Sequence, residues 1–320
     1  MDTELRIKLE VFQEKSGMSA TKIAQGIGIG ASTISEWKND KYKGDVETLE
    51  SKIADYLKRH EDPAKRIDFC VMTETTKKIF YVINTVAEYV ASATRAGVTE
   101  SAKIGFITGR AGLGKSWSLQ EYKKNHDNKI IFITAEAGDN ENVLLRKIAK
   151  EIKITDFMYG RMQAVKEKIK ERLKNSEKII VVDEGEHLTA RAIDCIRAIG
   201  DQTGVGIVIA GTNKLEGQIT SGRNEYEYLY SRTVIFMKLS DLNEADTKEI
   251  AGQYLGGRYD ENELEKLSKM FHKASKGSAR NLSNLLALAT KITSMNIEHT
   301  KGKINNRVID EASKMLGITV

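Results

Sequence analysis

The chain has little proline, little cysteine and no long apolar run. Its 320 residues include one proline and two cysteines, Cys70 and Cys195, which lie far apart and form no CxxC pair. This pattern excludes a disulfide scaffold and a cysteine zinc site, and it is typical of a reducing cytoplasm. No apolar segment approaches the roughly 18 residues that a membrane helix needs, so we expect no membrane partner. The first residues show no signal-peptide pattern, which also favours a cytoplasmic location.

The chain also lacks a strong excess of charge of either sign. The formal net charge is +5, with 40% hydrophobic and 30% charged residues, and this composition excludes collagen-like and largely disordered chains. Residues 1–60 carry ten basic and ten acidic side chains, whereas residues 251–320 carry eleven basic and seven acidic ones. Such mild basicity permits a polyanionic partner, but a solvated surface of mixed charge accounts for it equally well.

Residues 1–60 predict a small helical domain. Within residues 19–40 the apolar positions have the spacing of a helix-turn-helix, with glycines in the turn. If the second helix reads DNA, the side chains that it presents are Ser32, Thr33 and Lys38. The alternative is a helical bundle used for protein contacts. The balanced charge of the domain weakens the DNA interpretation, because phosphate neutralisation normally supplies most DNA affinity.

The rest of the chain predicts a linker, an α/β core and a second helical domain. Residues 61–73 hold the only proline within a dense charge run and are expected to be a linker. In the core, residues 74–239, short β-branched runs alternate with helical segments, which indicates a parallel sheet covered on both faces. The expected strands are 103–109, 129–136, 178–184, 205–212 and 233–239. Residues 240–320 have helical periodicity throughout and form the predicted C-terminal domain.

Residues 109–116 fit the phosphate-loop pattern G-x-x-x-x-G-K-[ST]. They follow an expected strand and open a helix, which is the context that the motif requires. Lys115 is expected to contact the β- and γ-phosphates of ATP, and Ser116 to ligate Mg²⁺. The glycines that let backbone N–H groups turn toward the phosphates are Gly109, Gly112 and Gly114.

Two carboxylates and one amide follow the next buried strands. Asp183 ends the strand IIVVD, where it would hold Mg²⁺, and Glu184 follows it as the group that activates the attacking water. A strand that ends in two carboxylates has few structural uses, because unpaired buried charge is costly. Asn213 comes after the strand 205–212 and is expected to position the water between Glu184 and the γ-phosphate.

Two arginines complete the predicted site. Arg232 directly precedes the last strand, where ring-forming ATPases project an arginine into the nucleotide of a neighbouring subunit; Arg223 is a competing candidate. Arg280 stands near the start of a helix in the C-terminal domain, from which an arginine can reach the γ-phosphate. The five motifs occur in the order found in AAA+ ATPases. The predicted fold is therefore α/β, with an AAA+ P-loop core, an N-terminal helix-turn-helix domain and a small helical C-terminal domain.

Three runs resemble a more specific family. Residues 39–59, 108–116 and 181–215 are similar to the phage Mu transposition protein B family, and the order of domains agrees over nearly the whole chain. The resemblance implies an ATP-dependent protein that forms helical filaments on double-stranded DNA, selects target DNA and delivers it to a transposase, which stimulates ATP hydrolysis. It also implies a location in the cytoplasm of a bacterial host.

The resemblance implies residue roles as well. The nucleotide roles proposed above fall on the matching positions Lys115, Ser116, Asp183, Glu184, Asn213, Arg232 and Arg280. In the segment before the Asp-Glu strand, Arg161 and Lys166 are the candidate DNA contacts. Two other functions fit the same motifs: a helicase loader of this fold, and a transcription regulator whose helix-turn-helix reads an operator while the ATPase core acts as a switch.

Overall fold

The structure is a computed structural model with two compact units, Met1–Asp68 and Phe69–Val320. The division falls within the predicted linker 61–73, of which residues 61–70 lie outside the described part of the chain. The structure describes residues 3–16, 19–42, 44–60, 71–97, 101–154, 162–220, 227–296, 300 and 302–318.

The first unit is a bundle of four helices around one tryptophan. Its helices are α1 (Thr3–Ser16), α2 (Ala20–Ile27), α3 (Ala31–Lys38) and α4 (Val46–His60). Trp37 of α3 is fully buried, and its indole N–H donates to the Glu50 carboxylate of α4 at 3.0 Å. This bond satisfies the polar end of a ring whose apolar body fills the core. The tight turn between α2 and α3 begins at Gly28, which has φ +78°.

The second unit contains a five-stranded parallel sheet in the order β2-β3-β4-β1-β5. The strands are β1 (Lys103–Thr108), β2 (Ile130–Thr134), β3 (Ile179–Asp183), β4 (Gly206–Gly211) and β5 (Thr233–Lys238). Each lies within one of the runs expected to be strands. The predicted parallel α/β core is therefore confirmed.

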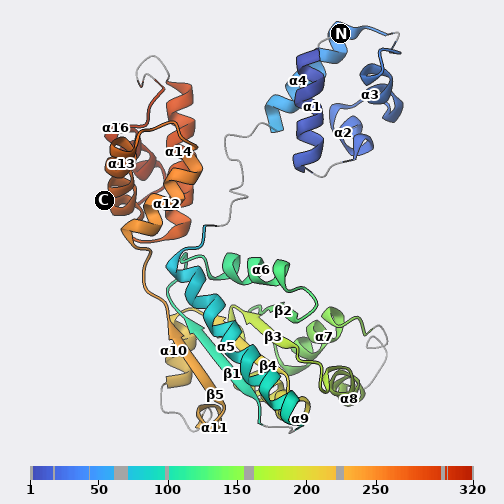
Figure 1. Cartoon of the computed structure of the whole chain (residues 1–320), viewed down its shortest axis with the longest axis vertical. Helices are drawn as coiled ribbons and strands as arrows, with labels where there is room; N and C mark the ends of the chain where they lie inside the picture. The colour runs from blue at the N-terminus through green and yellow to red at the C-terminus, as the bar shows by residue number, and fades with distance from the viewer. Residues whose placement is uncertain are drawn as a thin grey trace. The chain divides into compact units, whose positions relative to one another are not determined.

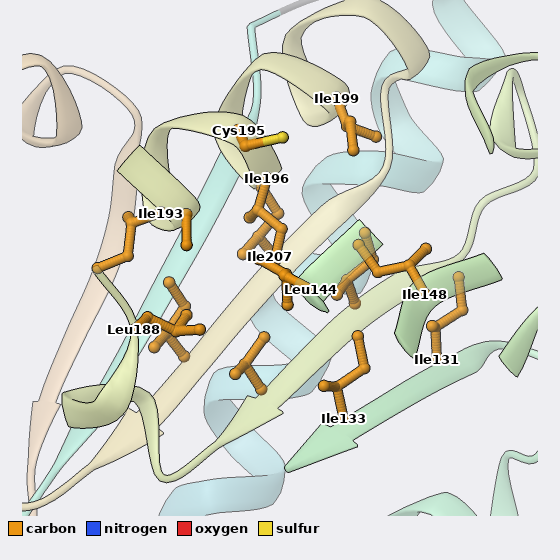
Figure 2. Close-up of a cluster of buried hydrophobic side chains, with 14 of the residues drawn as sticks. Ile131, Ile133, Leu144, Ile148, Leu188, Ile193, Cys195, Ile196, Ile199 and Ile207 are labelled. Carbon is orange, nitrogen blue, oxygen red and sulfur yellow. The ribbon is translucent and has the colours of Figure 1, made fainter. Parts of the chain in front are cut away.

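Helices cover both faces of this sheet. The helical elements of this region are α5 (Glu74–Ala96), α6 (Lys115–Asn125), α7 (Glu141–Glu151), α8 (Met162–Leu173), the short turn η2 (Gly185–His187), α9 (Ala190–Thr203), α10 (Asn213–Thr220) and α11 (Glu227–Tyr230). One face packs against α5, which crosses the sheet in Figure 1, and against α6; the other packs against α7, α8 and α9. Figure 2 shows the second face, where Ile196 of α9 meets Ile207 of β4. Alternate strand residues enter the two clusters, as the period of a strand requires.

The C-terminal part of this unit is helical. Its helices are α12 (Glu244–Leu255), α13 (Glu261–Ser275), α14 (Ala279–Met295) and α16 (Asn306–Met315), and they share a separate apolar cluster. Hydrogen bonds join it to the sheet region: the backbone N–H of Glu74 donates to Asp246 at 2.9 Å, and that of Arg280 to the Gly112 carbonyl at 3.0 Å. Among the helices that the structure describes, none has the length and apolar character needed to cross a bilayer.

Candidate nucleotide-binding site

The carboxyl ends of three neighbouring strands bring the predicted site together. The phosphate loop leads from β1 into α6, Asp183 is the last residue of β3, and Thr212 follows β4. Because β4 lies between β1 and β3, its end stands between the phosphate loop and Asp183. Ligands of open α/β sheets bind at this edge, outside the carboxyl ends of the strands.

The phosphate loop has the backbone that its glycines permit. Gly112 and Gly114 have φ of +85° and +89°, a region that other residues rarely occupy. The Lys115 ammonium is buried and donates to the carbonyl oxygens of Gly109 at 2.7 Å and Arg110 at 3.0 Å. The lysine is thus folded back over its own loop, where a phosphate group would be cradled.

Lys115 is influenced by charged groups of both signs. Burial lowers the pKa of Lys115, and the carboxylates of Glu186 and Asp183 oppose this shift while Arg280 adds to it. A bound polyanion would stabilise the charged form of this buried lysine, because phosphate oxygens would replace the water that burial removes.

Asp183 and Glu184 have different environments. The Asp183 side chain is buried, and its Oδ1 accepts the Glu184 backbone N–H at 2.9 Å. Glu184 itself has φ +55°, a strained value for a residue with a side chain, and its half-exposed carboxylate lies 3.8 Å from His187 Nε2. Such strain is common where a side chain must be presented to a ligand. Asp183, with the Ser116 hydroxyl at the exposed start of α6, forms the set of oxygens that would hold Mg²⁺ beside the phosphates.

The C-terminal helices contribute to the same site. Besides the bond from the Arg280 N–H, the Ser278 hydroxyl donates to the Gly112 carbonyl at 3.4 Å. A Cβ on Gly112 would lie 2.6 Å from this hydroxyl oxygen, so the contact also requires glycine there. The start of α14 is therefore seated on the phosphate loop, and the exposed Arg280 side chain lies close enough to act on Lys115.

At the end of β4 the structure reveals residues that the sequence reasoning missed. Asn213 is the exposed first residue of α10, whereas the backbone N–H of Thr212 donates to Glu186 Oε2 at 3.1 Å. Glu186 was not among the predicted site residues. The available signal was a second acid two positions after Glu184, directly behind the strand-end carboxylates.

Arg232 lies at the opposite edge of the sheet. It precedes β5, and its carbonyl accepts the N–H of Ile104 at the start of β1. Its Nε donates to the two carboxylate oxygens of Asp201 at 3.0 and 3.3 Å, and Arg197 binds the same carboxylate. The competing candidate Arg223 lies outside the described residues. Arg232 therefore stands away from the nucleotide edge of its own chain.

The predicted DNA contacts lie apart from one another along the chain. Ser32 is exposed, Thr33 is half-buried, and the half-buried Lys38 ammonium donates to Gln13 at 2.6 Å within the first unit. Lys166 of α8 is half-buried and interacts with the thiol of Cys195. Arg161 lies outside the described residues. All five remain predictions.

The comparisons with known proteins cover both the core and the whole chain. Residues 98–219 match the family described as AAA domain, which spans the phosphate loop and the strands β1 to β4. The chain therefore contains an AAA domain. This ATPase is 26% identical to the Mu-like prophage FluMu DNA transposition protein B of Haemophilus influenzae, with 81% of this chain and 87% of the relative covered. It is also 26% identical to the ATP-dependent target DNA activator B of Escherichia phage Mu, with 99% and 96% covered.

Solved structures agree on the fold of the ATPase. The ORC2 protein of Aeropyrum pernix superposes with a TM-score of 0.52 at 14% identity, covering 72% of this chain and 66% of that one. Cdc6p from Pyrobaculum aerophilum gives a TM-score of 0.51 at 15% identity, covering 72% and 65%. The expected AAA+ fold is confirmed. The resemblance to the Mu transposition protein B family is confirmed as well, because the curated relatives match over nearly the whole chain.

Proposed function

We propose that this ATPase binds double-stranded DNA with little sequence preference when it holds ATP and Mg²⁺, and assembles on it as a helical filament. The filament would select target DNA and activate a transposase. The observation that carries the proposal is the match over 99% of the chain to proteins named ATP-dependent target DNA activator B. A protein that acts on DNA in this way would work in the cytoplasm of the bacterial host.

The nucleotide chemistry of the proposal is assigned residue by residue. Lys115 and the glycine loop grip the phosphates, Ser116 and Asp183 hold Mg²⁺, Glu184 activates water, and Arg280 reaches the γ-phosphate from α14. Asn213 would orient the attacking water from the end of β4. The common edge of β1, β3 and β4 supports this set, since it brings the Asp183-Glu184 pair and the end of β4 to the side of the phosphate loop, while the start of α14 is bonded to Gly112 of that loop.

Electron microscopy of the full-length protein on random-sequence duplex DNA tests the assembly. With ATP and Mg²⁺ we expect continuous protein-coated DNA, and with ADP we expect bare duplex. Isolated particles at one sequence would instead support a transcription regulator, and particles only on a replicative helicase would support a loader. Addition of a transposase encoded beside this protein should raise ATP turnover; unchanged turnover would contradict the proposed partner.

DNA affinity should fall steeply with salt. A protein that neutralises six to ten phosphates loses roughly a thousandfold or more in affinity between about 50 and 200 mM salt, because bound counterions are released on association. We expect this slope with ATP on two duplexes of unrelated sequence, measured by fluorescence anisotropy. An operator reader would instead bind one sequence roughly a thousandfold more tightly than the other. A shallow slope together with such a preference would contradict the proposal.

Glu184→Gln should separate ATP binding from hydrolysis. The amide keeps the size of the side chain but cannot accept a proton, so turnover should fall about a hundredfold or more while ATP affinity is retained. DNA complexes formed with ATP should then persist longer, as a filter-binding time course would show. Glu88→Gln makes the same change at an exposed position on α5 and should leave turnover unaltered. Wild-type turnover in Glu184→Gln would show that Glu184 is not the base.

A further inference from the structure

We infer that Glu186 is a positioning residue for ATP hydrolysis: it ties the turn that carries Glu184 to the end of β4, where the γ-phosphate would be sensed. The inference rests on the proposed roles of Glu184 and Asn213 and adds a residue that neither the motifs nor the relatives assign. Glu186 belongs to the short turn η2, which directly follows Asp183 of β3 and Glu184.

Hydrogen bonds connect Glu186 of η2 to the segment that follows β4. Glu186 Oε2 accepts the Thr212 backbone N–H at 3.1 Å. The Thr212 hydroxyl also helps to lower the pKa of this carboxylate. In the reverse direction, the Gln218 amide of α10 donates to the Glu186 carbonyl at 3.3 Å. Glu186 thus binds both the residue before α10 and, through its backbone, the second turn of that helix.

Two glycines make room for this contact. A Cβ on Gly211 would lie 2.5 Å from Glu186 Oε2, and a Cβ on Gly185 would lie 2.3 Å from Ile209 of β4. Both values are shorter than real Cβ contacts, so a side chain at Gly211 would displace the Glu186 carboxylate and one at Gly185 would clash with β4. Neither glycine has a positive φ, so glycine is required at these positions because space is short and not because of the backbone conformation.

The contact holds the carboxylate in its charged form. Burial raises the pKa of Glu186, but Thr212, the backbone N–H of Glu186 itself and the charge of His187 together outweigh burial, and the pKa is lowered. The charge also acts on the Lys115 ammonium more strongly than that of Asp183 does. Glu186 therefore stands close to the phosphate loop without being the strand-end carboxylate that the motif supplies.

These bonds link the sensing position to the catalytic turn. Asn213 follows the bonded Thr212, and Glu184 precedes Glu186 by two residues, so a displacement at either end moves the other through one carboxylate. Activation of water requires Glu184 and the sensing residue in one fixed geometry, and misplacement by about 1 Å can cost roughly a hundredfold in rate. Loss of the link should therefore lower the rate of hydrolysis and leave the grip of Lys115 on the phosphates intact.

The test compares Glu186→Ala with Glu186→Gln in the full-length protein on saturating DNA. We expect Glu186→Ala to lower kcat by about tenfold to a hundredfold with little change in KM, as expected when geometry at the reacting centre is lost. Glu186→Gln should recover most of kcat, because its amide oxygen can still accept the Thr212 N–H. Thr212→Val, which loses the hydroxyl but keeps the N–H, should lie between. Glu216→Gln, which removes a carboxylate on the adjacent α10 that pairs with Lys238, should behave as wild type.

Binding and melting measurements make the outcome decisive. Titration with a non-hydrolysable ATP analogue and thermal melting should give wild-type values for Glu186→Gln and Thr212→Val. Equal losses of kcat in the Ala and Gln variants, or losses matched by weaker analogue binding and lower melting temperature, would overturn the inference. Wild-type kcat in Glu186→Ala would also overturn it. Glu184→Gln measured in parallel distinguishes the two failures: if it slows hydrolysis while Glu186→Ala does not, only the role of Glu186 is wrong.

Discussion

Arg232→Ala should lower ATP turnover on DNA by about a thousandfold or more, because an arginine supplied to a neighbouring subunit neutralises charge that develops only in the transition state. Arg232 lies at the amino-terminal edge of the sheet, away from the phosphate loop of its own chain. In a filament it would therefore act on the next subunit. A mixing experiment on DNA measures this: Arg232→Ala keeps a working phosphate loop, and Lys115→Ala keeps the arginine. Each should be nearly inactive alone, and the mixture should regain part of the turnover.

The ion pair with Asp201 requires its own control. Arg197 binds the same carboxylate from α9, so Arg197→Ala removes an arginine from Asp201 and leaves Arg232 in place. We expect Arg197→Ala to keep most of the turnover. If Arg197→Ala is as inactive as Arg232→Ala, the loss comes from disruption of the ion pairs at Asp201 and not from a missing arginine finger. A mixture that stays inactive although both variants assemble together would make Arg223 the next candidate.

Lys115→Ala should abolish ATP binding and, with it, ATP-dependent assembly on DNA. The buried ammonium bonds only its own loop carbonyls at Gly109 and Arg110 in the contacts described here, so its removal takes away the cation that meets the phosphates. ATP at a hundred times its Kd stabilises a protein by about 2.7 kcal/mol. We therefore expect ATP to raise the melting temperature of the wild type and not that of the variant, with DNA binding followed by anisotropy.

Lys124→Ala is the matched control for this prediction. The exposed Lys124 lies near the far end of the same helix, where it pairs with Glu121, and its removal should leave both ATP stabilisation and DNA assembly unchanged. The melting temperature without nucleotide shows whether either variant is misfolded. Wild-type assembly of a folded Lys115→Ala protein on DNA would mean that nucleotide is not the switch for assembly.

The strands and the phosphate loop could be predicted because their signals are local. Each strand of the core is a short β-branched run between glycines or charges, and the loop 109–116 has one spacing that fixes both its turns and its helix start. Asp183 and Glu184 follow such a run directly, so their place at the strand end is also a local property. For these residues the neighbours along the chain decide the conformation.

The order of the strands and the partners of single side chains could not be predicted, because they depend on contacts between distant parts of the chain. No local pattern says that β4 separates β1 from β3, although this order puts Thr212 beside the phosphate loop. No local pattern singles out Glu186, because only the packing of η2 on β4 brings it to the Thr212 N–H. Lys38, expected to face DNA, is turned toward α1 by Gln13, which is 25 residues away in the chain.

The sequence by itself therefore determined the α/β core, the phosphate loop and the carboxylates that follow β3, since each depends on the chain within a few residues. Tertiary structure alone decided which groups meet: the seat of α14 on Gly112, the ion pair of Arg232 with Asp201, and the bond between Glu186 and Thr212. These contacts join residues from 26 positions apart to more than a hundred, as in the bond from the Arg280 N–H to the Gly112 carbonyl. A hydrogen bond or ion pair forms only where packing fixes both partners at once, and the packing depends on the apolar side chains of the whole core.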